Sequence, residues 1–152
     1  MPAGGVSRAE IEEIIAVSFF RSVLGGEVAA YGDGQCELRA PIPAALRQFR
    51  GDVHGGIVGA LADDACAWAC ASVAGKLVTA SYTINFTGRA SGAELVARGQ
   101  VLKTGRRLVV GQSTVYSIED GREAPVAVLQ ATLALVGDTA EAAPPRLASR
   151  PD

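Results

Sequence analysis

Two adjacent carboxylates stand in a stretch of sequence that otherwise carries no charge. Between Gly55 and Gly75 the only charged residues are Asp63 and Asp64. A helix that is apolar or small on all sides is normally buried, and a buried carboxylate without a partner resists ionisation, so its pKa rises. Such acids are typical of catalytic clefts. One Asp could instead cap or pair while the other faces solvent, but for a neighbouring pair in so apolar a helix we expect at least one functional acid.

His54, Gly55 and Gly56 stand at the start of the same predicted helix. A helix N-terminus offers free backbone N–H groups and a positive dipole end. Glycine there lets a substrate oxygen reach those donors, which is the geometry of an oxyanion hole. The two glycines could also belong to an ordinary loop and have no catalytic role. A serine-type triad using His54 is disfavoured because no nucleophile-elbow sequence is present, and neither the dinucleotide fingerprint nor the Walker pattern occurs.

The elements that must position these groups follow from hydrophobic periodicity and turn residues. An amphipathic helix is predicted over residues 8–24, a short turn or helix over 44–49, and a long apolar helix over 54–74. Strands are predicted over residues 27–31, 35–40, 77–86, 94–103, 108–118 and 126–136. Thr104-Gly105 and Glu119-Asp120-Gly121 mark hairpin turns. Two strands, a long helix and a four-stranded meander predict an α+β fold, with one antiparallel sheet wrapped around one buried helix.

Length and charge limit the function classes. The 152 residues suit one domain, which we place at residues 26–136, after an N-terminal segment (1–25) carrying the amphipathic helix and before a disordered tail (137–152). The net charge is −2, so no nucleic-acid partner is expected. Residues 88–107 hold five basic residues and one acid, a charge of +4, which leaves −6 elsewhere. This basic band favours a small anionic ligand or forms a solvated sheet face.

Three cysteines, Cys36, Cys66 and Cys70, cannot all pair within one chain. Glutamates interrupt the N-terminal apolar stretch, so no secretory signal is predicted and a reduced, cytoplasmic location is expected. With a single histidine in the chain, buried thiols are favoured over a metal site. The central stretch is long enough to span a membrane, but its two acids would each cost about 2.5–3.5 kcal/mol on insertion scales. We expect no membrane partner.

The run from His54 to Asp63 resembles the HGG…LAD signature of hotdog-fold thioesterases, most closely the phenylacetate-degradation (PaaI-type) branch. The likeness continues through residues 65–70, 79–86 and 105–108, and covers roughly residues 26–136. The resemblance implies a hotdog fold and an acyl-coenzyme A thioesterase that forms a homodimer or a dimer of dimers, a homotetramer. It implies no cofactor, since coenzyme A is part of the substrate.

The resemblance also implies catalytic roles. Asp63 takes the place of the general base or nucleophile, and the Gly55 N–H polarises the thioester carbonyl. Gln48, six residues before His54, helps to place the thioester or water. A hydroxyl at the start of the next strand contacts the acid or the water, and Thr79 is the candidate. Asp64 is expected to be a structural partner of a backbone or arginine group.

The substrate-binding candidates lie around this centre and in the basic band: Gly56, Ala67, Trp68, Ser81, Arg89, Lys103, Arg106 and Arg107. Ser81 is the second candidate for the hydroxyl, and Trp68 either lines the acyl pocket or belongs to the core. The four cations are candidates for the nucleotide phosphates. The family's Arg-Pro pair after the strand is replaced here by Arg89-Ala90, which weakens the local coenzyme A assignment.

Gly55 and Asp63 are eight residues apart on one helix. At about 1.5 Å per residue, this separates them by roughly 12 Å, whereas reacting groups must approach to roughly 3–3.5 Å. If both act on one thioester, they come from two chains with their helices side by side. The active site is therefore expected to straddle a homodimer interface.

Two other functions remain open at this point. One is a hotdog enoyl-thioester hydratase or dehydratase, and the other is a non-catalytic acyl-coenzyme A-binding module. For the thioesterase, small aryl and medium-chain acyl groups are equally compatible with the sequence.

Overall fold

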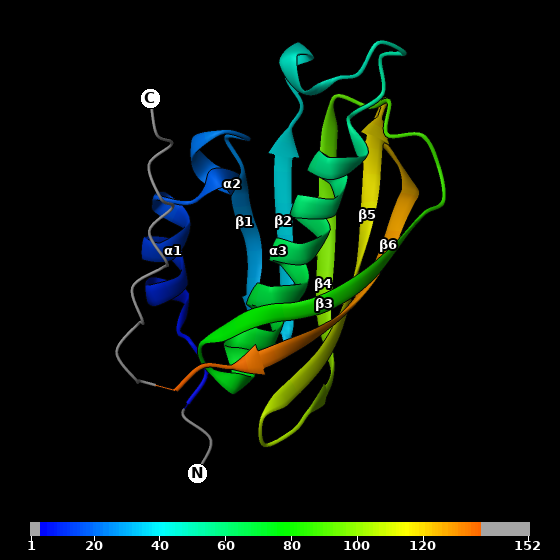
Figure 1. Ribbon diagram of the computed structural model, residues 1–152. Helices are drawn as coiled ribbons and strands as arrows, with labels where there is room; N and C mark the ends of the chain where they lie inside the picture. Colours follow the sequence, from blue (N-terminus) through cyan, green and yellow to red (C-terminus); the bar gives the residue numbers. More distant parts are fainter. Residues whose placement is uncertain (1–3, 138–152) are drawn as a thin grey trace, which may run out of the picture.

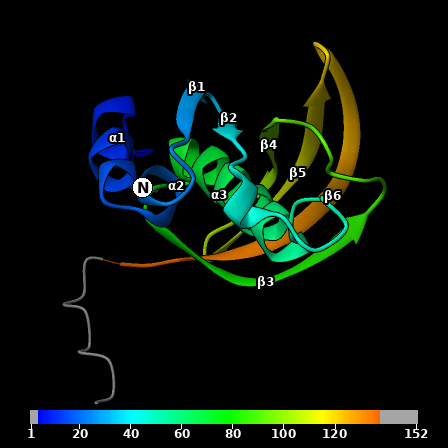
Figure 2. The same cartoon turned by 90° about the horizontal axis from the view of Figure 1, so that it is seen from above.

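The computed structural model describes residues 4–137, in which a six-stranded antiparallel sheet curls around one long helix, α3 (Gly55–Ala74) (Figure 1). The sheet order is β1 (Glu27–Gly32), β2 (Gln35–Pro41), β4 (Glu94–Thr104), β5 (Leu108–Glu119), β6 (Arg122–Leu135) and β3 (Leu77–Phe86). Two short helices, α1 (Arg8–Ala16) and α2 (Phe19–Ser22), flank β1, and a 3₁₀ turn, η1 (Ala44–Leu46), precedes α3. Seen from above, the sheet forms an arc around α3 (Figure 2). The predicted α+β hotdog fold is confirmed.

The helix α3 lies directly on the strands because the sheet offers small residues beneath it. A side chain at Gly99 in β4 would collide with the Ala65 carbonyl group of α3. The buried Ser113 hydroxyl of β5 donates a hydrogen bond to the Ala62 carbonyl at 2.7 Å. The length and composition of α3 would allow it to cross a membrane. However, 61% of its apolar stretch is buried inside this fold, so α3 is the core helix.

The last four strands do not form the predicted meander. β3 pairs with β6 at the edge of the sheet, not with β4. Hydrophobic periodicity reports which face of a strand is buried, but not which strand lies beside it. The seven residues 87–93 are long enough to carry the chain from the edge to the centre, whereas β4–β5 and β5–β6 are joined by the predicted tight hairpins.

The prediction of one continuous helix over residues 8–24 is also wrong, because this segment forms two helices, α1 and α2. The Ser18 hydroxyl and N–H both donate to the Ile15 carbonyl, which turns the chain at the end of α1. The turn brings the buried Phe20 edge-on against Trp68, with ring centroids 5.4 Å apart. The predicted tail, residues 137–152, lies outside the described residues apart from Gly137.

As the edge strand, β3 is largely exposed and carries large apolar side chains. The exposed fractions of Val78, Tyr82 and Phe86 are 52%, 48% and 57%. An edge strand with an unpaired row of backbone N–H and C=O groups is a surface on which another chain can add.

Candidate active site

Asp63 lies midway along α3, on the flank that faces β3, and its carboxylate is half-buried. The Thr79 hydroxyl donates a hydrogen bond of 2.9 Å to Asp63 Oδ1. Burial raises the pKa of this carboxyl above its usual value, and the hydrogen bond from Thr79 partly offsets that rise. The carboxylate is therefore held in one orientation by a neutral donor and remains basic enough to accept a proton.

Asp64 points away from this centre. It is more deeply buried, and burial together with the negative charge of Asp63 raises its pKa to about 7. The expected backbone or arginine partner is not found, because its carboxyl forms no hydrogen bond or ion pair among residues 4–137. Burial raises the pKa of the Cys36 thiol on β2, and the negative charge of Asp64 raises it further.

Replacing Asp64 with Asn is expected to stabilise the protein at high pH. The folded-state pKa of about 7 lies above the unfolded value of 3.8, so the folded chain holds this proton more tightly. The stability that this group contributes is present below about pH 4 and is lost as the pH rises towards 7. At about pH 8 the Asp64→Asn variant should gain at most on the order of 4 kcal/mol in free energy of unfolding, and near pH 4 the gain should vanish.

Urea denaturation of the wild type and of Asp64→Asn at both pH values measures this gain. A gain that is the same at both pH values, or a pH-dependent gain shared by the exposed-turn variant Asp33→Asn, contradicts the assignment.

The start of α3 leaves one glycine N–H available for a ligand. His54 is the N-cap residue, and its Nδ1 accepts a hydrogen bond of 2.9 Å from the Gly56 N–H. The Gly56 donor is thereby occupied. The Gly55 N–H, in contrast, is bonded to no group within residues 4–137. Of the two predicted donors, Gly55 is the one poised to bind a carbonyl oxygen at the positive end of the helix dipole.

Gln48 lies in the turn that leads into α3. Its N–H donates to the Asp52 carbonyl and its own carbonyl accepts from the Gly51 N–H, both at 2.8 Å. The side chain is exposed and makes no hydrogen bond within the described part of the chain. Because the His54 N–H donates to the Leu46 carbonyl, Gln48 stays close to the first turn of α3.

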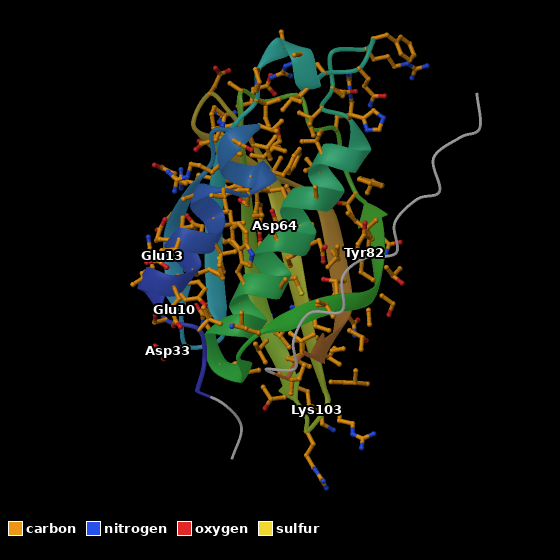
Figure 3. The ribbon with its side chains drawn as sticks, turned by 60° about the vertical axis from the view of Figure 1, so that its left-hand side comes forward. Glu10, Glu13, Asp33, Asp64, Tyr82 and Lys103 are labelled. Atoms are coloured by element: carbon orange, nitrogen blue, oxygen red, sulfur yellow. The ribbon has the colours of Figure 1, made fainter. Side chains whose placement is uncertain are left out.

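The strand β3 runs along α3 in the opposite direction, which pairs side chains of the two elements. Thr79 meets Asp63, the Tyr82 hydroxyl lies over Gly59, and the Phe86 ring lies against Gly55. A side chain at Gly55 would come within 3.2 Å of Phe86. Figure 3 shows Tyr82 on the β3 side of α3. Neither aromatic residue was predicted from the sequence, because the bulge between Thr79 and Ser81 is what brings Tyr82 and Phe86 to the same face of β3 as Thr79.

Other predicted residues are more scattered. Ala67 is partly exposed one turn after Asp63 and borders the same strip of α3. Trp68 is 9% exposed and packs on Phe20, so its ring belongs to the core of this chain. Ser81 is exposed in a shallow hollow between β3 and β6, past the bulge in β3, and Thr79 is the hydroxyl that reaches the acid.

The structure separates the four predicted phosphate-binding cations into two groups. Arg89 precedes β4 and pairs with Asp52 at 3.1 Å, whereas Lys103 stands near the other end of β4. Glu94 and Lys103 of β4 are nine residues apart and therefore about 30 Å from each other, at roughly 3.3 Å per residue, so the two groups stand near opposite ends of the strand. Figure 3 shows Lys103 near one end of the sheet. Arg106 and Arg107 follow Lys103 in the turn between β4 and β5. Within one chain, the two groups cannot bind the same phosphate.

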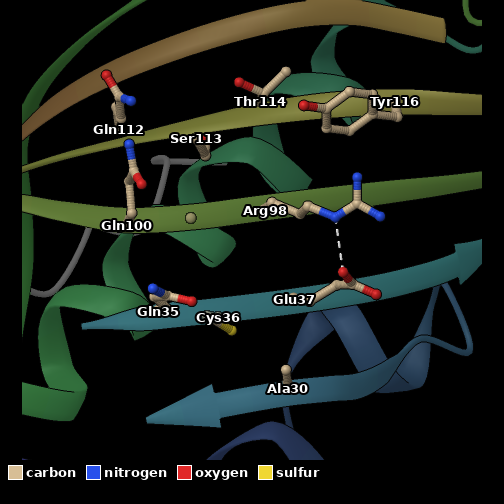
Figure 4. A pocket seen from close by; sticks show the side chains of 11 residues that line it. Ala30, Gln35, Cys36, Glu37, Arg98, Gln100, Gln112, Ser113, Thr114 and Tyr116 are labelled. Atoms are coloured by element: carbon tan, nitrogen blue, oxygen red, sulfur yellow. Dashed lines mark hydrogen bonds and ion pairs between the residues drawn. The ribbon is translucent and has the colours of Figure 1, made fainter. Parts of the chain in front are cut away.

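The convex face of the sheet, opposite α3, has a polar hollow of about 350 Å³ (Figure 4). Gln35, Gln100 and Gln112 lie in cross-strand register there, and Arg98 donates to Glu37 at 2.8 Å. None of the predicted site residues lines it. The face that carries the catalytic candidates is the concave one.

The thiols of Cys66 and Cys70 are buried beside Gly111 of β5. The hydrogen bond with Cys70, together with burial, raises the pKa of the Cys66 thiol. Across residues 4–137, no three His, Cys, Asp or Glu side chains gather where they could hold a metal ion. The pair packs as small apolar side chains.

Comparison with known proteins places this geometry among related folds. The family model of the thioesterase superfamily matches residues 50–124, which include Gly55, Asp63 and Thr79. A thioesterase family protein from Silicibacter pomeroyi is 34% identical, with a TM-score of 0.79 over 84% of this chain and 96% of that one. A conserved protein from Pseudomonas aeruginosa is 32% identical, with a TM-score of 0.69 over 78% and 94%.

More distant likenesses show the fold alone. The PaaI protein of the Escherichia coli phenylacetic acid degradation operon is 22% identical, with a TM-score of 0.74 over 84% of this chain and 91% of that one. No curated protein matches the sequence.

Proposed function

This chain belongs to the thioesterase superfamily and is a thioester hydrolase, and from this premise we propose that it cleaves acyl-coenzyme A esters to free acid and coenzyme A. The observation that carries the proposal is the half-buried Asp63 carboxylate, fixed by Thr79 on the open flank of an apolar helix. A carboxylate with a raised pKa is suited to accept a proton near neutral pH.

In the proposed reaction, the Gly55 N–H donates to the thioester carbonyl oxygen and stabilises the negative charge that develops there. Asp63 removes a proton from water, whose oxygen attacks the carbonyl carbon, and the C–S bond breaks to release the thiolate. Alternatively, an Asp63 oxygen attacks the carbonyl carbon and the C–S bond breaks to expel the thiolate. Water then hydrolyses the resulting mixed anhydride, which releases the acid and regenerates the Asp63 carboxylate. Gln48 orients the water or the carbonyl. The reaction needs no cofactor, because the thiolate is a good leaving group.

A site built from two chains is part of the proposal. Gly55 and Asp63 of one chain lie about 12 Å apart along α3, so one thioester meets Gly55 of one protomer and Asp63 of its partner. The edge strand β3 supports this arrangement, because it is exposed, carries apolar side chains and contributes Thr79. Two β3 strands paired across a two-fold axis would bring the two α3 helices side by side. We propose a homodimer formed through β3, with dimers pairing further into a tetramer.

Lysines on the edge of β3 are expected to separate the protomers and abolish activity. The variant Val78→Lys/Thr83→Lys places two charges on one exposed edge, where like charges would oppose each other across the dimer. Light scattering should report a monomer, and thiol release should fall by at least about 100-fold because Gly55 and Asp63 no longer meet. The control Val128→Lys changes an exposed valine on β6, inside the sheet, and should keep the dimer. A fully active monomer contradicts the shared site.

The coenzyme A assignment draws on the unpaired cations of the β4–β5 hairpin. Lys103, Arg106 and Arg107 are exposed and form no ion pair within the described residues. They are suited to the nucleotide phosphates. Arg89 already pairs with Asp52 and stands at the other end of β4, so it contacts the same ligand only if it comes from the partner chain. The half-exposed Phe86 and Tyr82 rings beside α3 suit a flat aryl or a medium-length alkyl acyl group.

A thiol-release assay across aryl and alkyl acyl-coenzyme A esters tests this function. Steady release of free thiol supports hydrolysis. Conversion of an enoyl thioester without thiol release would instead identify a hydratase. Saturable binding without turnover would identify a non-catalytic acyl-coenzyme A-binding module. A cytoplasmic location completes the proposal, since the three cysteines are unpaired and buried, as suits a reducing compartment.

A further inference from the structure

Arg47 ties two loops together at the start of α3. Its Nη1 donates to the Gly51 carbonyl at 2.9 Å and to the Ser91 carbonyl at 3.1 Å. Its Nη2 donates to the Gly92 carbonyl at 2.7 Å. Within residues 4–137 the guanidinium forms no ion pair, so its charge is balanced by these carbonyl dipoles. Gly51 belongs to the turn that carries Gln48, and the other two acceptors belong to the β3–β4 loop.

The turn that Arg47 holds, residues 47–53, contains no regular strand or helix. It is closed by the bridge between Arg47 and Val53 and by the two backbone hydrogen bonds of Gln48 with residues 51 and 52. Two further contacts join this turn to the β3–β4 loop: the Val53 N–H donates to the Ala90 carbonyl at 2.9 Å, and Arg89 pairs with Asp52 at 3.1 Å. The Arg89 side chain is largely exposed, so this ion pair contributes little. The turn lies at the surface, so burial contributes little to its rigidity. The position of this turn relative to the β3–β4 loop therefore depends in large part on the three hydrogen bonds of Arg47.

The conformation of this turn decides where the Gln48 amide points. The Gln48 side chain has no hydrogen-bond partner within the described residues and is exposed, so only its backbone fixes its position. A displacement of about 1 Å at a positioning group can cost about 100-fold in rate. From this geometry we propose that Arg47 is a positioning residue for thioester hydrolysis, which holds the Gln48 amide in register with the Gly55 N–H. This inference rests on the proposed function and adds a residue to it.

Kinetic analysis of Arg47→Met and Arg47→Lys tests the role. Arg47→Met removes all three hydrogen bonds, and kcat should fall roughly 10- to 100-fold while KM stays within about two-fold. Lysine keeps the charge but cannot span both loops, so Arg47→Lys should be intermediate. Arg50→Met is the matched control, since Arg50 lies in the same turn, stands over the ring of Phe49 and has no side-chain hydrogen bond or ion pair within residues 4–137. It should keep wild-type kinetics.

A double-mutant cycle with Gln48→Ala separates positioning from general stabilisation. If Arg47 acts through Gln48, substitution of Arg47 in the Gln48→Ala background should lower kcat no further. If Arg47→Met does not fold, Arg47→Lys replaces it in the double-mutant cycle with Gln48→Ala. Fully additive losses overturn the inference, as do unchanged kinetics in both Arg47 variants while the wild type releases thiol. A wild-type enzyme that releases no thiol refutes the proposed function itself, which is a distinguishable result.

Discussion

Replacing Asp63 with Asn is expected to lower kcat for thioester hydrolysis by about 10²–10⁴-fold, the contribution usual for a positioned base. The amide of asparagine accepts a hydrogen bond from Thr79 but neither takes a proton from water nor attacks a carbonyl carbon. KM should change little, because the proposed site assigns the acyl and nucleotide contacts to other groups. Steady-state thiol release with the best acyl-coenzyme A ester measures both constants.

Two neighbouring substitutions make this test specific. Asp64→Asn alters the adjacent carboxyl, which faces away from Thr79, and should retain most of the activity. Thr79→Val removes the 2.9 Å hydrogen bond to Asp63 Oδ1, so the carboxylate loses its fixed orientation and kcat should fall less than in Asp63→Asn. Asp63→Asn with wild-type kcat would remove the mechanism, and a larger loss in Asp64→Asn would move the catalytic role to Asp64.

Gly55→Pro should inactivate the enzyme by removing a single N–H group. Proline is favoured at the first position of a helix, where its fixed φ fits and the missing N–H breaks no helical hydrogen bond. The preceding residue, His54, has φ −59° and ψ 132°, a conformation compatible with a following proline. Loss of the oxyanion donor should lower kcat about 10²–10³-fold. Gly55→Ala adds a similar contact with Phe86 but keeps the N–H, and so serves as the control.

Mixing two inactive variants then tests the shared site directly. In a heterodimer of Asp63→Asn and Gly55→Pro, one of the two sites contains both defects and the other contains neither. Random subunit exchange should therefore restore roughly a quarter of wild-type activity, because half of the dimers are mixed and each has one intact site. Continued inactivity of a mixture shown by mass spectrometry to contain heterodimers would place Gly55 and Asp63 of the same chain in one site.

The sequence was sufficient to predict the main elements because each has a local signal. The long helix was predicted from its apolar composition and the glycine that ends it, and the structure begins it at Gly55, one residue later than expected. The hairpins were predicted from their turn residues. The position of β3 beside β6 was not, because it depends on the path of residues 87–93 and on the fit of β3 against α3. Such tertiary contacts leave no periodic pattern in the sequence.

The residues of the candidate site divide in the same way, into those with a local signal in the sequence and those that only tertiary contacts reveal. Asp63 was predicted because a charge in an apolar helix is conspicuous, and Thr79 because the resemblance points to a hydroxyl near the start of the next strand. Phe86 and Tyr82 were missed, since their relevance depends on glycines of α3 that face them. Arg47 was missed because its partners are backbone carbonyls, which no side-chain motif reveals.

The exposed edge of β3 has a consequence for how such an enzyme behaves at low abundance. When each site needs two polypeptides, the turnover measured per molecule becomes a function of how often the molecules meet. Below the dissociation constant of the dimer, the rate should scale with the square of protein concentration instead of linearly. In that range, halving the protein concentration would lower the rate about four-fold, so a small fall in expression would reduce the reaction disproportionately.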